Sequence, residues 1–580
     1  MMINNHKIAE IFLQMADILD IKGDNVFKIN AFRRGAQIVE NFPREFSDAY
    51  NENPENLNNV AGLGEGLKSK IIELITTGNL NEFNDILKNF DTGLLEMLKI
   101  RGVGPKKVKL FYEKLGINSV EKLKKACEKQ EIQKLPKMGE RSETEILNAI
   151  QEISTFSNNR YLINSALEDA ENLISFLKNC SEIKQIQYAG SLRRFKESIG
   201  DIDIISTSKN KNSEQIMNYF LEYPQIFKVL SKGDTKSSVI LLSGIQVDLR
   251  VVDNNSFGSA LHYFTGNKEH NIKIREIAKS KGLKINEYGV FKDEKRISGE
   301  QEEDIFKAVD LPFIPPEIRR NDGEIEYAIK HKSFPKFVDL KDIIGDLHMH
   351  SDFSDGRFSM EEMANEAIKR GYKYIGFADH SDFLKITNGM DENKIKKQWL
   401  QIDKLNKKLL NKIHIFKSCE VDILKNGSLN MPDHILKELD YTICSVHIRY
   451  SELDREKQTK RILKALSNPF VKILAHPTGR KINSRPELDI DMELIIKACV
   501  DKNILLEINS SPQRLDLYDK YILMAKNLGA KFVINSDAHF PFDFENLKFG
   551  VGMARRGWLE VDNIINTLPL DKIKSILKKI

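Results

Sequence analysis

Hydrophobic residues follow a helical spacing through the first 155 residues. Near the start of the chain, Ile8, Ile11, Phe12, Met15 and Leu19 recur three and four positions apart, which predicts one apolar face of a helix. No basic region followed by a purely apolar one precedes or overlaps this stretch, so we expect it to open a domain rather than to act as a signal peptide.

Short apolar runs replace this spacing from about residue 186. They read QIQYAG, DIDIIS, SVILLSG and IQVDLRVV, with helical stretches between some of them, and they predict a mixed α/β unit. Residues 312–342 are rich in proline, charge and single aromatic residues, so we expect an extended, solvated linker there.

Seven apolar runs alternate with amphipathic helical stretches after residue 343. They are IIGDLHMH, YIGFADH, IHIFKSCEVD, YTICSVH, VKILAHP, ILLEINS and KFVINSDAH. The alternation predicts parallel βαβ units, and seven such strands favour a barrel. Each run ends in polar residues, which is where α/β barrels carry their chemistry.

Composition limits the class of protein. A chain of 580 residues is too long for one core, and at roughly 150 residues per domain it predicts about four domains. With 41% hydrophobic and 30% charged residues it is not a mostly disordered, collagenous or disulfide-stapled chain. No window approaches the roughly 18 apolar residues of a membrane span, and five scattered cysteines without a CxxC pair indicate reduced thiols in a cytoplasmic protein. The net charge of +4 does not indicate a nucleic-acid partner by itself.

Two glycine hairpins lie in the helical region, at residues 60–66 (VAGLGEG) and 100–105 (IRGVGP). Gly-x-Gly before a helix exposes backbone N–H groups that can bind phosphate without reading sequence, although a tight turn between helices gives the same pattern. Residues 99–125 carry nine basic and two acidic residues, a run that a solvated lysine-rich helix would also show. Together these features favour a clamp on the DNA backbone and resemble the helix-hairpin-helix motif of DNA repair proteins. The candidate DNA contacts are Gly62, Gly64, Gly102, Gly104, Lys106 and Lys107.

Three aspartates form the first candidate catalytic cluster. Asp201 and Asp203 alternate with isoleucines, so on a strand both carboxylates point to one face, and Asp248 lies in a second such strand. An exposed polar strand face is the alternative for the first pair alone. Three aspartates on adjacent strands can hold two Mg²⁺ ions for phosphoryl transfer. Gly190, Ser191 and Arg194 would then face a triphosphate with a close backbone, a hydroxyl and a guanidinium.

The motifs GSLRR, GDID, VDLR, YFTG and INEY, in this order and spacing, resemble a family X DNA polymerase. The resemblance implies a lyase-like (8-kDa-like) domain over 1–85, helix-hairpin-helix fingers over 86–155, a nucleotidyltransferase palm over 156–262 and a nucleotide-binding thumb over 263–318. It implies that Asp201, Asp203 and Asp248 bind Mg²⁺ or Mn²⁺ and that Ser191 and Arg194 hold phosphates. It further assigns the incoming nucleotide or the template to Tyr263, Phe264, Gly266, Lys268, Asn271 and Arg275. Lys268 replaces the acidic residue of some animal relatives, and its charge would strengthen nucleotide binding.

The same resemblance places the Schiff-base lysine of the lyase at Lys70, with Lys68 as a neighbour that would depress its pKa. Gly66 stands where eukaryotic lyases carry a phosphate-binding lysine, and Phe32 replaces a tyrosine, while Lys28 remains for a 5′-phosphate. The sequence therefore favours DNA-end binding over lyase chemistry.

Histidines and carboxylates gather at the ends of the seven predicted strands. Mixtures of this kind suit Mn²⁺, Zn²⁺ or Fe²⁺, and nine ligands exceed what one ion uses, so a cluster of two or three metals is expected. The candidate ligands are His348, His350, Asp355, His380, Glu420, His447, His476, Asp537 and His539.

The motifs DLHMHSDFSDG, GFADH, CEVD, SVH, AHPTGR and NSDAH resemble the polymerase-and-histidinol-phosphatase (PHP) domain over residues 343–580. The resemblance implies a distorted (β/α)7 barrel that attacks phosphoesters with a metal-activated hydroxide. Arg480 and Arg449 are candidate phosphate clamps, and an exposed salt bridge is the alternative for each.

The sequence thus predicts a multidomain α/β protein: a helical DNA-binding region, a palm with a small thumb, a linker over 319–342 and a PHP barrel. The expected function is gap filling with dNTPs on gapped or nicked DNA in base excision repair, by a cytoplasmic monomer with no membrane partner. The barrel would act as a 3′-5′ exonuclease, a 3′-phosphatase or an abasic-site (AP) endonuclease. Two alternatives stay open: the PHP domain is only structural, or the chain is a non-catalytic DNA-end binder or has a small-molecule phosphatase in its second half.

Overall fold

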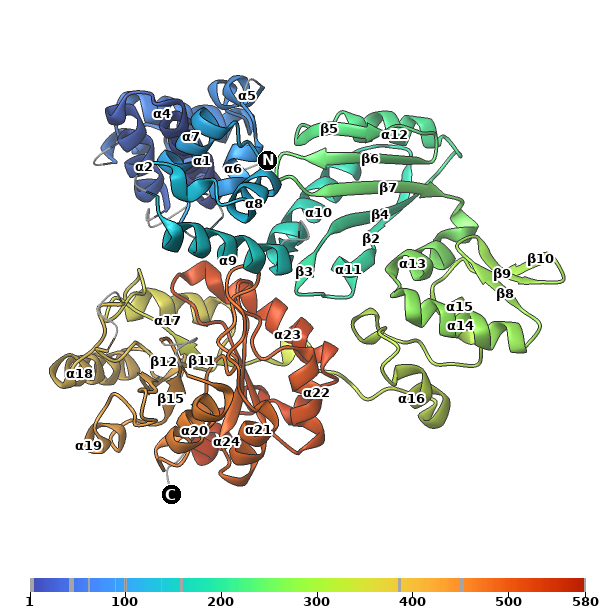
Figure 1. Cartoon of the computed structure of the whole chain (residues 1–580). Helices are drawn as coiled ribbons and strands as arrows, with labels where there is room; N and C mark the ends of the chain where they lie inside the picture. Colours follow the sequence, from blue (N-terminus) through green and yellow to red (C-terminus); the bar gives the residue numbers. More distant parts are fainter. Residues whose placement is uncertain are drawn as a thin grey trace. The chain divides into compact units, whose positions relative to one another are not determined.

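The computed structural model describes residues 5–40, 46–60, 63–88, 90–98, 100, 102–136, 138–156, 160–383, 387–448 and 453–577. The chain divides into two compact units, Met1–Asn158 and Asn159–Ile580 (Figure 1). Within the described ranges, no helix has both the length and the apolar character needed to cross a membrane.

The first unit is helical, as its hydrophobic spacing predicts. Its helices are α1 (Asn5–Lys22), α2 (Val26–Glu40), α3 (Phe46–Glu52), α4 (Glu65–Thr77), α5 (Asn81–Lys88), α6 (Gly93–Leu98), α7 (Pro105–Leu115), α8 (Val120–Glu128) and α9 (Glu140–Phe156). The apolar face of α1 is buried, and Phe32 of α2 meets Phe12 edge to face at 5.5 Å between ring centroids. Phe32 therefore serves the hydrophobic core of this unit.

A five-stranded sheet, called the central sheet below, begins the second unit. Its elements are β1 (Tyr161–Leu162), α10 (Ile163–Leu177), β2 (Ile183–Tyr188), α11 (Gly190–Arg193), β3 (Ser198–Ile199), β4 (Asp201–Ser208), α12 (Ser213–Leu221), β5 (Ile226–Ser231), β6 (Lys236–Leu241) and β7 (Gln246–Val252). The strand order is β2-β4-β7-β6-β5, in which only β4 and β7 run parallel. Buried Ile202, Ile204, Val247 and Leu249 form one face of these two strands.

The next elements are called the thumb region. They are α13 (Phe257–Thr265), α14 (Lys268–Ser280), β8 (Lys284–Asn286), β9 (Gly289–Lys292), β10 (Lys295–Ser298) and α15 (Glu303–Ala308). The three strands form a small antiparallel sheet in the order β10-β9-β8.

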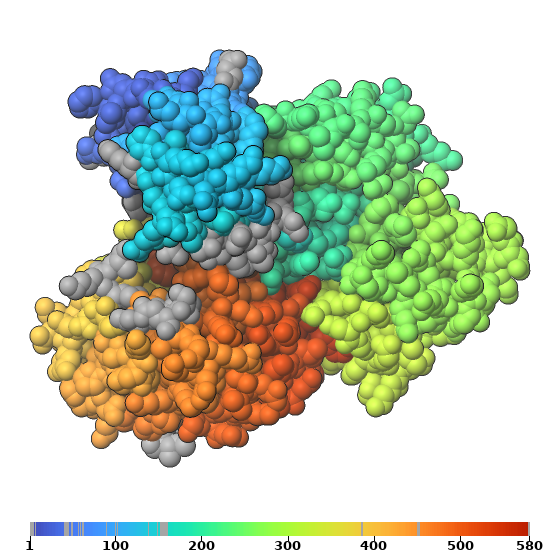
Figure 2. Space-filling model, in the orientation of Figure 1, coloured from blue at the N-terminus to red at the C-terminus, as the bar shows by residue number. Residues whose placement is uncertain are grey.

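The expected linker over 319–342 is not extended and solvated. It contains helix α16 (Glu324–His331), and its Arg319, Ile325, Ala328 and Val338 are fully buried. Its aromatic residues surround Trp558 from the end of the chain, with Tyr327 at 5.2 Å and Phe334 at 5.8 Å between ring centroids. In the space-filling view this yellow-green segment lies against the orange and red surface of the barrel (Figure 2). The prediction was wrong because a partner so distant in sequence leaves no local pattern.

The last part of the chain forms the C-terminal barrel. Its elements are β11 (Gly345–Met349), α17 (Met360–Lys369), β12 (Tyr374–Phe377), α18 (Glu392–Lys408), β13 (His414–Lys417), β14 (Glu420–Asp422), α19 (Asp433–Leu436), β15 (Thr442–Ser445), α20 (Arg455–Ala465), β16 (Val471–Leu474), α21 (Met492–Asp501), β17 (Leu505–Asn509), α22 (Asp519–Asn527), β18 (Phe532–Asn535), α23 (Leu547–Arg556) and α24 (Leu570–Leu577).

All strand pairs of this barrel are parallel. Strands β13 and β14 continue one another, and bonds from His350 N to Ala538 O and from Asp537 N to His348 O join β11 to the end of β18. The seven predicted strands therefore close into a ring, and their polar ends meet at one mouth.

Candidate functional site

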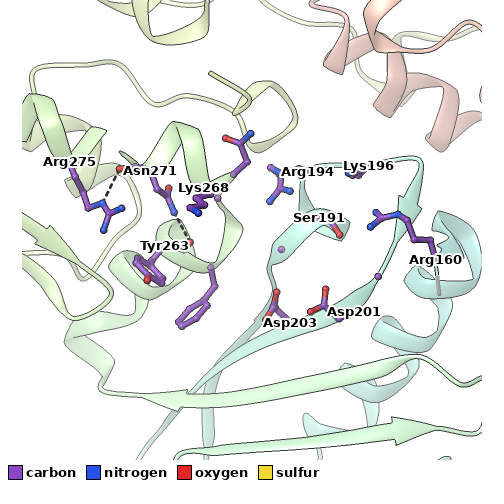
Figure 3. Close-up of a pocket in the computed structure, with 15 residues that line it drawn as sticks. Arg160, Ser191, Arg194, Lys196, Asp201, Asp203, Tyr263, Lys268, Asn271 and Arg275 are labelled. Carbon is purple, nitrogen blue, oxygen red and sulfur yellow. Dashed lines mark hydrogen bonds between the residues drawn. The ribbon is translucent and has the colours of Figure 1, made fainter. Parts of the chain in front are cut away.

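A pocket of about 430 Å³ lies between the central sheet and the thumb region (Figure 3). Its lining is strongly polar and includes all the residues that the sequence assigns to a nucleotide. The lining residues are Arg160, Gly190, Ser191, Arg194, Lys196, Gly200, Asp201, Asp203, Tyr263, Phe264, Gly266, Asn267, Lys268, Asn271 and Arg275. Sequence reasoning missed Arg160 and Lys196, because each lies in a loop just outside the motifs that point to a nucleotide.

The three aspartates lie on the parallel pair β4 and β7. Asp203 is directly opposite Asp248 in the strand register, and Asp201 lies two positions before Asp203 on the same face. Gly190 packs against Asp203, since a Cβ added to this glycine would lie 2.7 Å from Asp203 Oδ2. Its φ of +63° and this close approach both require glycine at the start of α11.

Electrostatics distinguish the three carboxylates. Burial, with the charges of Asp201 and Asp248, raises the pKa of Asp203 to about 6. Burial alone would also raise the pKa of Asp248, but hydrogen bonds from Lys236 and Gln246 lower it. Lys236 Nζ lies 2.9 Å from Asp248 Oδ2, so an ammonium group from β6 balances the carboxylate that is not in the pocket lining.

Cations face these aspartates across the pocket. Burial and the nearby Arg556 and Arg319 lower the pKa of Arg194 to about 10, so this guanidinium remains charged at neutral pH. Its Nη1 donates to the carbonyl oxygen of Thr265, which ties α11 to the thumb region.

Aromatic and amide groups of the thumb region form the opposite wall. Tyr263 and Phe264 meet edge to face at 5.1 Å, and the Arg250 guanidinium lies 4.3 Å from the Phe264 ring centroid. Asn271 donates to the carbonyl oxygen of Tyr263 at 2.8 Å, and Arg275 Nε lies 3.3 Å from the carbonyl oxygen of Asn271. The structure thus places all the sequence-assigned nucleotide residues at one pocket.

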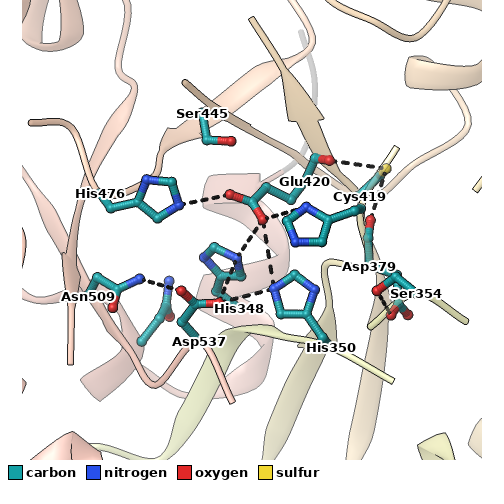
Figure 4. Close-up of polar contacts among 12 residues, drawn as sticks. His348, His350, Ser354, Asp379, Cys419, Glu420, Ser445, His476, Asn509 and Asp537 are labelled. Atoms are coloured by element: carbon teal, nitrogen blue, oxygen red, sulfur yellow. Dashed lines mark hydrogen bonds and ion pairs between the residues drawn. The ribbon is translucent and has the colours of Figure 1, made fainter. Parts of the chain in front are cut away.

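Glu420 lies at the centre of a second site, at the mouth of the C-terminal barrel (Figure 4). Its carboxylate oxygens are close to ring nitrogens of five histidines: His476 at 2.9 Å, His380 at 3.1 Å, His447 at 3.3 Å, His348 at 3.4 Å and His350 at 3.7 Å. Burial would raise the pKa of Glu420, but the histidines hold it well below its usual range.

The remaining carboxylates complete this site. Asp537 lies 3.1 Å from His350 Nε2, and Asp355 lies 3.4 Å from His539 Nε2. Three groups of ligand atoms lie within 4.8 Å of one another and share members: His350–Asp355–His380–His539, His348–His350–Glu420 and His380–Glu420–His447. All nine predicted ligands therefore meet at one mouth. Shared ligands of this kind suit a cluster of metals.

The donor atoms fit metal ions. His348 Nδ1 donates to Glu507 Oε1 at 2.6 Å, which leaves its Nε2 facing Glu420 and Asp537 at 3.4 and 3.6 Å. Buried His350 Nδ1 has no hydrogen-bond partner among the described residues. The His476 and Asp537 backbones are left-handed, with φ of +28° and +55°, a strain that is typical of functional sites. Sequence reasoning missed Glu507, although it is a charged residue within the apolar run of β17.

One of the two candidate phosphate clamps of the barrel, Arg480, is held by other groups of the protein. Arg480 is nearly buried, pairs with Glu197 of the central-sheet region at 2.8 Å and donates to the carbonyl oxygens of Arg514 and Leu515. Its guanidinium is thus already bonded on several sides. Arg449 lies outside the described residues. Arg514, which follows β17, has its Nε 3.8 Å from Asp537, and its buried Nη1 lacks a partner among the described residues.

In the helical unit, the described glycines of the hairpins have free space beside their backbone. A Cβ added to Gly64, Gly102 or Gly104 would meet nothing within 4 Å, so a ligand backbone has access there. Gly102 has a φ of +84°, Gly104 precedes α7, and Gly64 precedes α4. Lys106 is exposed, whereas Lys107 Nζ donates to the carbonyl oxygen of Gly102 at 2.7 Å. Gly62 lies outside the described residues.

Lys70, the lyase candidate, pairs with Glu82, to which Lys28 Nζ also binds at 3.1 Å. Burial would raise the pKa of Glu82, but these two lysines lower it. Lys68 is bound to Glu65 at 2.8 Å.

Comparison with known proteins supports this architecture. Family models match for a helix-hairpin-helix domain (residues 3–80), a SAM-like helix-hairpin-helix tandem (94–152), a DNA polymerase beta thumb (260–320) and a PHP domain (346–511). They confirm the predicted multidomain α/β fold class with its helix-hairpin-helix region, thumb and PHP domain.

The chain is 38% identical over 579 residues to the DNA polymerase/3'-5' exonuclease PolX of Bacillus subtilis (strain 168), with 99% of each chain covered. Its second half resembles shorter proteins: a "probable phosphatase" of Thermoanaerobacter sp. (strain X514) is 30% identical over 248 residues, 41% of this chain and 95% of the relative. Another of Clostridium acetobutylicum is 31% identical over 212 residues, 35% of this chain and 81% of the relative. The chain therefore belongs to the PolX family of DNA polymerase/3'-5' exonucleases, the family X polymerases that carry a C-terminal PHP domain.

Proposed function

We propose that the chain fills short gaps in DNA during base excision repair and that its barrel cleans the 3′ end first. The observation that carries the first part is the register of Asp203 and Asp248 on β4 and β7, beside a cation-lined pocket. The carboxylates on the two strands suit Mg²⁺, which prefers oxygen ligands, and the cationic side chains of the pocket suit the triphosphate of a dNTP.

In the polymerase reaction, Asp201, Asp203 and Asp248 would hold Mg²⁺ or Mn²⁺. When bound, these ions would lower the pKa of the attacking 3′-hydroxyl and would stabilise the charge on the phosphate. Ser191, Arg194 and the N–H groups of α11 bind the β and γ phosphates, and Tyr263 and Phe264 flank the sugar. Arg160 and Lys196 add charge for the same triphosphate.

The helix-hairpin-helix turns bind the DNA backbone without reading sequence. Open space above Gly64, Gly102 and Gly104 allows a phosphate to approach their N–H groups. Gapped or nicked DNA is therefore the substrate, and the base is chosen by pairing with the template.

At the barrel, the nine ligands would hold two or three Mn²⁺, Zn²⁺ or Fe²⁺ ions, which supply a hydroxide for phosphoester hydrolysis. Arg514, with a free guanidinium edge beside Asp537, would bind the scissile phosphate. A 3′-5′ exonuclease is the activity that the family favours. The shorter relatives described as phosphatases favour a second candidate, removal of a 3′-terminal phosphate.

Incorporation of one labelled nucleotide into a one-nucleotide gap tests the polymerase. The wild type should extend the primer and Asp248→Ala should not, while Glu214→Gln, which changes an exposed acid on α12, should extend normally. Equal extension by Asp248→Ala would contradict the metal assignment.

Hydrolysis is tested in the Asp201→Ala/Asp203→Ala variant, so that the polymerase cannot mask it. With Mn²⁺, three substrates are compared: a mismatched 3′-hydroxyl end, a 3′-phosphate end and an internal abasic site. Shortening of the first identifies an exonuclease, loss of phosphate alone a phosphatase, and internal incision an AP endonuclease. If none of the three is processed, the barrel is structural.

A further inference from the structure

Two side chains of the C-terminal barrel reach the backbone of the nucleotide pocket. Arg556 Nη1, at the end of α23, lies 2.6 Å from the carbonyl oxygen of Arg194. Asn483 Nδ2 lies 2.7 Å from the carbonyl oxygen of Arg160. Both acceptor residues line the pocket. The barrel thus holds the main chain at two of the cations that face the triphosphate in the proposed function.

Arg556 is itself fixed before it reaches Arg194. Its Nε donates to Asp519 Oδ2 at 2.9 Å, and Arg320 Nη1 lies 2.6 Å from the same oxygen. The Arg556 side chain is 9% exposed. A buried guanidinium with one edge fixed by a carboxylate presents its other edge in a defined direction.

The loop that follows Arg194 is held at further points. Phe195 has a φ of +52°, and its ring lies so close to α23 that a Cβ on Gly552 would be 2.1 Å from its Cδ1. Glu197 pairs with Arg480, whose guanidinium lies 4.1 Å from the Tyr518 ring centroid. Residues 194–197 are therefore anchored to the barrel by a hydrogen bond, an aromatic contact and an ion pair.

We propose that Arg556 and Asn483 are positioning residues for nucleotide binding. By fixing the carbonyl groups of Arg194 and Arg160, the barrel fixes the backbone from which these two side chains project. A triphosphate then meets cations that are already in place, which lowers the entropic cost of binding. This inference rests on the proposed function of the pocket.

A merely structural interface would behave differently. It would change the stability of the whole unit, and with it the amount of active enzyme, but it would not raise the KM for the nucleotide selectively. The split between KM and kcat therefore separates the two explanations.

The test uses the full-length chain on a one-nucleotide gap. Arg556→Ala removes the donor to Arg194, and Arg556→Lys keeps a charge that can partly replace it. Asn483→Gly removes the donor to Arg160 and tolerates the positive φ of this residue, +60°. Arg370→Ala is the control, because both partners of this arginine, Glu366 and Glu545, lie within the barrel.

For Arg556→Ala we expect the KM for dNTP to rise about tenfold, the order of one lost hydrogen bond to a charged group. The kcat value should change less than KM, and Mn²⁺-dependent hydrolysis should be unchanged. Arg556→Lys should recover part of the loss, Asn483→Gly should raise KM about threefold, and Arg370→Ala should match the wild type.

An unchanged KM in both Arg556→Ala and Asn483→Gly overturns the inference, as does a parallel fall of extension and hydrolysis in both. If Arg556→Ala does not fold, the KM of Asn483→Gly is the test, because Asn483 is exposed and its replacement removes one hydrogen bond at the surface. If the wild type extends the primer and the variants have the same KM, only this inference is refuted. If the wild type does not extend the primer at all, the proposed function is refuted.

Discussion

The central sheet carries three aspartates on two neighbouring strands beside a pocket, while at the barrel three carboxylates meet six histidines, and the charge is balanced differently in the two places. Glu420 has five imidazoles within 3.7 Å. Asp203 instead sits beside two other carboxylates, which, after burial, help to raise its pKa to about 6. Among the described residues, ligand groups within 4.8 Å of one another occur at the barrel mouth and do not include the three aspartates.

This difference indicates when each site becomes complete. The barrel has its counter-charges and its candidate ligands in place in the folded chain alone, so we expect it to bind metals without a substrate. The aspartates are wider apart, and one is bound to Lys236. We therefore expect their site to be completed only when ions bind together with a nucleotide.

The largest expected effect separates the two sites. Glu420→Gln removes the charge shared by two of the three ligand groups, so Mn²⁺-dependent hydrolysis should fall by about 10³-fold while gap filling stays unchanged. Bound Mn²⁺ should fall in parallel, as measured by metal analysis after gel filtration. Glu438→Gln, an exposed acid of the same barrel, is the control. Retained hydrolysis would show that the barrel cluster is not the hydrolytic site.

Glu507→Gln should weaken Mn²⁺ binding at the barrel by about 10- to 100-fold, because His348 loses the carboxylate that orients its ring. Isothermal titration with Mn²⁺ measures the change. The matched control is Glu392→Gln, since Glu392 lies 3.2 Å from the exposed His434 and makes the same kind of pair at the surface. Equal Mn²⁺ affinities in both variants would mean that the pair with Glu507 does not orient His348 for metal binding.

Arg514→Lys should lower kcat/KM for hydrolysis about tenfold and leave Mn²⁺ affinity unchanged, because a lysine keeps the charge but loses the guanidinium edge that binds phosphate. Arg455→Lys, at an exposed position on α20, is the control. A fall in Mn²⁺ affinity instead would identify Arg514 as a support for Asp537.

At the central sheet, Lys236→Met should lower the Mg²⁺ concentration for half-maximal extension about threefold, because the ammonium no longer competes for Asp248. Lys232→Met, four residues earlier and exposed, controls for the loss of one positive charge from this part of the protein. A higher Mg²⁺ requirement would show that Lys236 holds Asp248 in position for Mg²⁺ rather than competing with Mg²⁺ for it.

The smallest expected change is in DNA binding by the helix-hairpin-helix region. Lys106→Ala should reduce the slope of log affinity against log salt concentration by about one, since one phosphate contact is lost. Lys124→Ala, on a helix face where this lysine pairs with Glu128, should leave the slope unchanged. An unchanged slope in both would assign Lys106 to the solvated surface.

Local sequence pattern determined much of this protein. The period-two alternation around Asp201 and Asp203, the seven apolar runs with polar ends, and the hairpin of Gly102 and Gly104 each depend on neighbours within a few residues, and each forms the expected element. Parallel strand ends meet by geometry, so the grouping of the nine barrel ligands followed from the fold class.

Contacts between distant segments were decided only by the tertiary structure. Trp558 packs into the segment that was expected to be a linker, Arg480 is bound to Glu197, and Arg556 reaches the carbonyl oxygen of Arg194 across 362 positions of the chain. Burial and pairing of this kind depend on which surfaces of the folded chain meet. The sequence around a single aromatic residue or arginine shows no periodic pattern that would identify a partner far away in the chain.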